Sequence, residues 1–169
     1  MKNKKLQFGF TLAEMLVALV IIALMAAAAY ILIKPAEDKG KIESTKATIE
    51  LLCGAIEQYH NFYNEFPDPN NDTRPAADCN DTELVYYRLS LCPDSVAILN
   101  QIDSKMVRNY DNDDYPEYVD AWGNAFKYEY RKNNEENFPL IISAGPDKKF
   151  GNATNSDDPD IADNITSRK

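Results

Sequence analysis

The amino-terminal part of the chain carries one long apolar run, and the pattern after it is polar with a helical rhythm. Residues 15–33 read MLVALVIIALMAAAAYILI, 19 residues without a charge, and Lys34 ends the run. A helix of this length spans about 28 Å at about 1.5 Å per residue, close to the hydrocarbon thickness of a bilayer. The pattern therefore predicts a membrane-spanning helix near the amino terminus.

After Pro35 the apolar positions recur at helical spacing. Intervals of seven, three, four, three and four residues place them on one face of an amphipathic helix. Pro35 and Gly40 should weaken or kink the helix between its two halves. The helix should end before Phe66-Pro67, because a residue preceding proline avoids the α region. The apolar positions are Ile42, Ile49, Leu52, Ile56, Tyr59 and Tyr63.

Short elements follow the long helix. Residues 67–80 and 111–118 read as loops, whereas a short helix is expected from Asp81 or Thr82 to Leu89. Pro93 opens a second short helix, whose apolar positions are Val96, Leu99 and Ile102.

The carboxyl-terminal part contains two patterns typical of strands. Phe126, Tyr128 and Tyr130 alternate with charged residues, which predicts a half-buried strand, and residues 140–142 form a more buried one. A polar turn at 133–137 makes the pair an antiparallel hairpin packed on the long helix. The expected fold class is α+β.

The charges flanking the apolar run indicate its membrane topology and whether it is cleaved off. Lys2, Lys4 and Lys5 precede it, which predicts that the amino terminus stays inside and the rest is exported. A cleaved signal peptide is the ordinary alternative, with an A-x-A site in residues 26–29. Against it, the run continues to Ile33, and Glu14 lies near its start. A carboxylate there costs about 2.5–3.5 kcal/mol on insertion scales and is usually functional.

Composition excludes several function classes. With 18 Lys+Arg against 27 Asp+Glu the net charge is −9, which disfavours a nucleic-acid backbone as partner. The single histidine, His60, is expected to be structural, and no Ser/His/Asp or Cys/His set points to an enzyme. The six glycines form no phosphate-binding motif. Asp111–Asp114 suggests calcium, but an EF-hand would need glycine and glutamate where Pro116 and Trp122 stand.

The cysteines and the acidic tail leave alternatives open. An exported domain permits one disulfide, for which Cys79–Cys92 is preferred over three reduced thiols, and Cys53 is expected to be a small core residue. Asp147, Asp157, Asp158, Asp160 and Asp163 bring five carboxylates within 17 residues. They form either a solvated acidic tail or a site for a hard cation such as calcium.

Residues 5–15, KLQFG followed by FTLAEM, resemble the processing site of type IV prepilins and type II secretion pseudopilins. The resemblance implies that a dedicated aspartic peptidase cuts between Gly9 and Phe10 and then methylates the new amino terminus of Phe10. Residues 1–9 would be a leader, 10–33 a transmembrane and filament-core helix, and 34–169 a periplasmic globular domain. In the filament, Glu14 would pair with the Phe10 amine of a neighbouring subunit, which removes an unpaired charge from an apolar environment.

The carboxyl-terminal half resembles the major pseudopilin of type II secretion. The resemblance rests on Asp120-Ala-Trp-Gly-Asn124, the strand pair, Ser143-Ala-Gly-Pro-Asp147 and a later Asp-Asp pair followed by Asp-Ile. It implies a long helix packed on short helices and a small antiparallel sheet, and one structural calcium ion. The implied ligands are the side chains of Asp147, Asp157 and Asp158 and carbonyls near Ala144 and Lys149, with Asp160 as a weaker candidate.

The resemblance implies a structural subunit and no enzyme. It would sit in the inner membrane with its domain in the periplasm and polymerise into a pseudopilus that drives protein export. Its partners would be the prepilin peptidase, further copies of itself, minor pseudopilins and an inner-membrane assembly platform. The alternatives are a type IV pilus subunit for adhesion, motility or DNA uptake, and a secreted periplasmic binding domain or enzyme.

Overall fold

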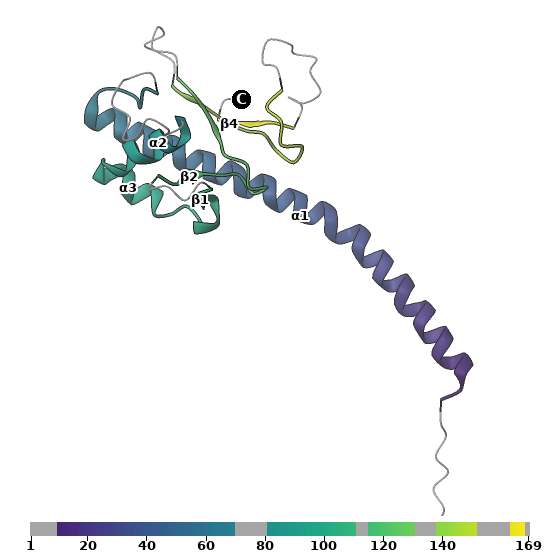
Figure 1. Cartoon of the computed structure of the whole chain (residues 1–169). Helices are drawn as coiled ribbons and strands as arrows, with labels where there is room; N and C mark the ends of the chain where they lie inside the picture. Colours follow the sequence, from purple (N-terminus) through teal and green to yellow (C-terminus); the bar gives the residue numbers. More distant parts are fainter. Residues whose placement is uncertain (1–9, 70–80, 111–114, 131–137, 152–162, 168–169) are drawn as a thin grey trace, which may run out of the picture. The chain divides into compact units, whose positions relative to one another are not determined.

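A computed structural model describes residues 10–69, 81–110, 115–130, 138–151 and 163–167. They fall into two compact units, Met1–Lys39 and Gly40–Lys169. A long helix, short helices and small antiparallel sheets follow one another along the chain, so the α+β prediction is confirmed (Figure 1).

The long helix α1 spans Leu12–Tyr63, 52 residues, and runs through both Pro35 and Gly40 without ending at either. A proline inside a helix loses one hydrogen bond and adds a steric clash, but flanking turns can keep the helix intact. The predicted end before Phe66 is confirmed.

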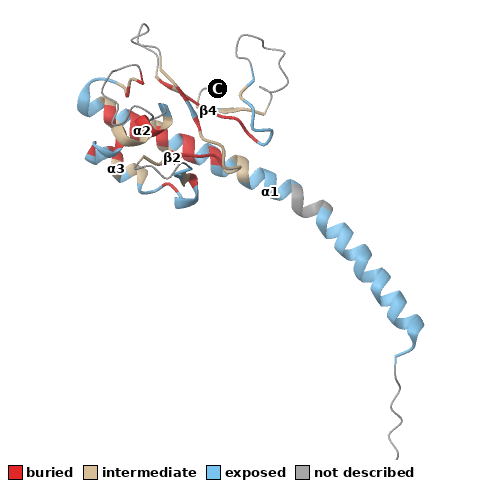
Figure 2. Cartoon of the chain, in the orientation of Figure 1, coloured by how far each residue is buried: buried red, intermediate tan, exposed pale blue. Residues whose placement is uncertain are grey.

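The carboxyl-terminal half of α1 buries the predicted face. Ile49, Leu52, Ile56 and Tyr59 are buried, which confirms the middle of the pattern (Figure 2). Its two ends differ, since Ile42 is only partly buried and Tyr63 is 41% exposed. The charged residues assigned to the other face are exposed: Glu43, Lys46, Glu50 and Glu57.

The two predicted short helices are present as α2, Asp81–Ser90, and α3, Pro93–Leu99. Ile102 lies beyond the end of α3 but is still buried. The fully buried Ser95 hydroxyl donates to the Ala55 carbonyl oxygen at 2.7 Å, which anchors α3 to α1. Full burial of a side chain such as Leu84 in α2 stabilises the fold by about 1.5–3 kcal/mol.

A two-stranded sheet was not expected from the sequence. After the 3₁₀ turn Ser104–Met106, β1 (Val107–Arg108) pairs antiparallel with β2 (Glu117–Tyr118). The prediction that 111–118 is entirely loop is therefore wrong at its end. Strands of two residues are too short for alternation to appear in a sequence.

The predicted hairpin is confirmed and extended by a third strand. β3 (Lys127–Glu129) pairs with β4 (Leu140–Ser143), and Tyr128 stands opposite Ile141. β5 (Ile165–Thr166) joins the other edge of β4, an addition that the sequence did not predict. The turn expected at 133–137 and most of the loop expected at 67–80 lie outside the described residues.

The core joins the helical and sheet parts of the Gly40–Lys169 unit. Ile56 of α1 belongs to one buried cluster with Val85, Tyr118, Phe126 and Ile141. The buried Tyr128 hydroxyl donates to the Pro67 carbonyl oxygen at 2.8 Å, which ties the segment after α1 to the sheet. Burial also raises the pKa of Tyr128 well above its ordinary value.

Candidate functional site

The start of α1 is built as a capping box. Thr11 precedes the first helical residue, and its backbone N–H and its Oγ1 both donate to Glu14 Oε2, at 2.8 and 2.9 Å. The Glu14 N–H donates in return to Thr11 Oγ1 at 3.2 Å. A Thr-x-x-Glu sequence whose side chains satisfy each other's backbone N–H groups in this way fixes the first turn of a helix.

The capping box gives Glu14 a partner in its own chain. The sequence prediction gave this carboxylate only a neighbour's amine as partner, although Thr11-x-x-Glu14 is itself a capping-box pattern. Both hydrogen bonds from Thr11 use Oε2, so the box leaves Oε1 to other partners. The predicted pairing with Phe10 of another subunit therefore remains compatible with the geometry. Phe10 itself is 85% exposed, and Gly9 lies outside the described residues.

The apolar half of α1 is exposed wherever its side chains are described. Every residue from 12 to 30 is exposed, and more than half of them carry large hydrophobic side chains (Figure 2). By length and composition this is the one helix, among the described residues, that could cross a membrane. A contiguous apolar surface of this size needs a cover of lipid or of other protein chains.

The acidic segment 147–163, called the acidic loop from here on, is only partly described. Ala144 is fully buried just after β4, and Asp147 and Lys149 follow it in the loop. Asp157, Asp158 and Asp160 lie outside the described residues, so the predicted ligand set stays a prediction. Among the residues that are described, no three acidic, histidine or cysteine side chains form a metal-binding group.

The described part of the loop nevertheless contains oxygens suited to a hard cation. The Asp147 N–H donates to Asp163 Oδ2 at 3.3 Å, and Asp147 Oδ1 accepts the Lys149 N–H at 2.8 Å. Asp163 Oδ1 and Asn164 Oδ1 are buried atoms with no hydrogen-bond partner among the residues that the structure describes. Such oxygens are costly to bury unsatisfied, and carboxylate and amide oxygens are ligands that calcium prefers. The residues present therefore fit the predicted ion.

Sequence reasoning did not assign these two residues to the site. Asp163 was counted among the acidic residues but not as a ligand, and Asn164 gave no signal. Asp163 approaches Asp147 because Gly145 has a positive φ of 68° and no side chain, and a Cβ there would lie 2.6 Å from the Asp163 carbonyl oxygen. The turn at Gly145 thus brings the end of β4 against the residues that precede β5.

Among the described residues, Cys53 and Cys92 form no disulfide. Cys92 is fully buried, and its Sγ lies 4.0 Å from the Gln58 carbonyl oxygen. The proposed partner Cys79 lies outside the described residues, so the Cys79–Cys92 disulfide remains an untested prediction.

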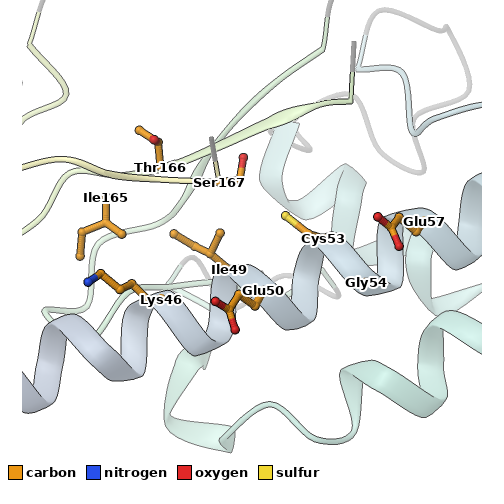
Figure 3. Close-up of a pocket in the computed structure, with 9 residues that line it drawn as sticks. All are labelled: Lys46, Ile49, Glu50, Cys53, Gly54, Glu57, Ile165, Thr166 and Ser167. Carbon is orange, nitrogen blue, oxygen red and sulfur yellow. The ribbon is translucent and has the colours of Figure 1, made fainter. Parts of the chain in front are cut away.

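Cys53 lines a groove of about 410 Å³ between α1 and β5 (Figure 3). Burial raises the pKa of its thiol to about 11, while a hydrogen bond with Ser167 opposes part of that rise. At neutral pH the thiol is therefore protonated and a poor nucleophile, as expected for a packing residue. His60 is also structural in its contacts, since its ring stacks on Phe66 at 4.3 Å between centroids.

Comparison with known proteins matches the amino-terminal site. Residues 4–30 match the prokaryotic N-terminal methylation motif, which is the motif of type IV prepilin-like proteins. Neither the comparison with curated proteins nor that with solved structures found a significant match.

The motif falls on the segment whose geometry is described above. It covers the exposed apolar helix, the Thr11–Glu14 capping box and the predicted cleavage site. It implies processing by a prepilin peptidase, and the apolar helix indicates anchoring in a membrane. It also points to a structural subunit rather than to an enzyme. The N-terminal methylation motif and the long exposed helix thus indicate a type IV pilin-like protein, the subunit of a pilus or of a pseudopilus.

Proposed function

We propose that this chain is a subunit of a type II secretion pseudopilus. A prepilin peptidase would cut after Gly9 and methylate Phe10. The subunit would then be anchored in the inner membrane, with residues from 34 onward in the periplasm, until it polymerises through residues 10–33. The observation that carries the proposal is the methylation motif at 4–30 on an apolar helix that is exposed from 12 to 30.

Filament growth would follow from burial of that helix among its copies. Lipid tails are as apolar as the side chains, so association in the membrane depends on close packing and on polar pairs rather than on a hydrophobic driving force. Small residues at 26–29, four consecutive alanines, let helix backbones approach closely. Glu14 would supply the polar pair by accepting the Phe10 amine of a neighbouring subunit at its free oxygen.

A structural calcium ion in the acidic loop is part of the proposal. Asp147, Asp157 and Asp158 with carbonyls at Ala144 and Lys149 would hold it, and the unpartnered buried oxygens of Asp163 and Asn164 support adding these two residues to the site. The ion would neutralise carboxylates that otherwise repel one another and would satisfy oxygens that otherwise lack a partner.

The choice of a secretion pseudopilus over a pilus rests on the carboxyl-terminal half. The Asp120–Asn124 loop, the Ser143–Asp147 turn and the acidic loop are the features that resemble a major pseudopilin. The net charge of −9 also disfavours the DNA uptake served by some pili. Minor pseudopilins and an inner-membrane platform would then be the assembly partners.

A gene deletion in the host distinguishes the two filaments. Without this subunit, proteins destined for the medium should accumulate in the periplasm, while surface pili, twitching and DNA uptake persist. Complementation with the wild-type chain should restore export. Normal export combined with loss of pili or motility would make the chain a type IV pilus subunit instead.

A further inference from the structure

A single buried carboxylate organises the loop between β2 and β3. Asp120 is 1% exposed, and both of its oxygens accept two hydrogen bonds. Oδ1 accepts the N–H groups of Trp122 and Asn124 at 2.9 and 2.8 Å. Oδ2 accepts Asn124 Nδ2 at 3.0 Å and the Ser143 hydroxyl at 2.7 Å.

The two side chains that bind Oδ2 also hold Gly145. Asn124 Nδ2 donates to the Gly145 carbonyl oxygen at 3.0 Å, and Ser143 Oγ accepts the Gly145 N–H at 3.0 Å. Both backbone polar groups of Gly145 are therefore fixed by partners of the Asp120 carboxylate. Since Gly145 packs directly against Asp163, its position sets where Asp163 meets Asp147.

The same loop is tied to α1. The Ala121 N–H donates to Oγ1 of Thr45, which is fully buried in α1, at 3.1 Å. A hydrogen-bonded path thus runs from α1 through Asp120 to the turn at Gly145. Packing already restricts the groups that these hydrogen bonds join. The bonds can therefore hold the turn at Gly145 in one arrangement.

We infer that Asp120 is a positioning residue for the acidic loop. Its carboxylate, acting through Asn124 and Ser143, presets the Gly145 turn and so places the oxygens of Asp147 and Asp163 before any cation binds. The four hydrogen bonds of the Asp120 carboxylate given above go to Trp122, Asn124 and Ser143, none of which is a proposed ligand. Only the consequence for calcium affinity rests on the proposed calcium site, because the ordering of the turn is a property of the chain alone.

The test removes the hydrogen bonds through Ser143 and compares the result with a matched control variant. Asp120→Asn would place an amide NH₂ group against the hydrogen-bond donors that now face the carboxylate, and the chain would risk misfolding. The informative variant is therefore Ser143→Ala. Ser95→Ala is the control, because both serines are fully buried and donate a hydrogen bond of 2.7 Å, but Ser95 bonds Ala55. Hydrogen exchange of residues 147–149, whose described N–H groups bond Asp163 and Asp147 and not Ser143, is measured by mass spectrometry of overlapping peptides on the full chain in detergent, without calcium.

Ser143→Ala should speed exchange in residues 147–149 about fivefold, the effect of one lost buried hydrogen bond, while Ser95→Ala leaves it at the wild-type rate. Equal rates in the two variants, or no change in Ser143→Ala, would overturn the inference. In titrations with calcium chloride, Ser143→Ala should bind about fivefold more weakly than Ser95→Ala. If the wild type binds no calcium, the calcium proposal fails, and the exchange data still decide the role of Asp120.

Discussion

Subunits carrying Glu14→Ala should reach the membrane at normal levels and fail to polymerise. Removing one partner of a buried charge pair costs about 3–5 kcal/mol, which is more than a hundredfold in a contact equilibrium. Insertion should not suffer, because the substitution removes a charge from an apolar segment. The measurement is the fraction of subunit recovered in sheared filaments compared with the fraction left in the membrane.

The capping box makes a second substitution necessary. Glu14→Ala removes both the negative charge and the side-chain half of the capping box, whereas Glu14→Gln removes only the charge, since glutamine also completes a capping box. If Glu14 acts by charge pairing with the Phe10 amine of a neighbour, both variants should lose filaments to the same extent. Filaments at wild-type yield in Glu14→Gln would reduce the role of Glu14 to capping its own helix.

Chelation of calcium should lower the melting temperature of the full chain in detergent by about 5–10 °C. An ion present at about 100 times its dissociation constant stabilises the folded state by about 2.7 kcal/mol, and each kcal/mol shifts the melting temperature of a domain of this size by about 2–4 °C. Added calcium should restore the higher value. Magnesium should do so poorly, because it demands stricter octahedral geometry.

Two substitutions test whether the calcium-dependent shift in melting temperature arises at the acidic loop. Asp163→Asn should reduce the calcium-dependent shift, since Asp163 Oδ1 is a buried oxygen that no described residue hydrogen-bonds. Glu50→Gln changes the charge equally at an exposed position of α1 and should keep the full shift. Identical melting with chelator and with calcium in the wild type would instead favour the solvated acidic tail.

The elements that the sequence predicted well are those with long periodic signals. The apolar run, the Ile49–Tyr59 face of α1 and the alternation of Phe126, Tyr128 and Tyr130 each extend over several turns or pairs. The burial of the Ile49–Tyr59 face and of Phe126 and Tyr128 follows directly from that spacing. Glu14 is singled out because a charge beside such a run is costly, and its role in assembly stays a prediction.

The features that escaped prediction depend on contacts between distant parts of the chain. β1, β2 and β5 are two residues long, and each exists only through its partner strand. The network around Asp120 joins residues separated by 23 positions in one bond and by 76 in another. Asp163 and Asn164 gave no distinguishing signal, because their environment is set by the turn at Gly145.

The mass of the mature amino terminus tests the central claim most directly. Full chain purified from its host membrane should begin at Phe10 and carry one added methyl group on its α-amine, with the apolar helix retained. An amino terminus near Ala29 or Tyr30, with that helix removed, would show that the chain is an exported protein with an ordinary signal peptide and would contradict the account.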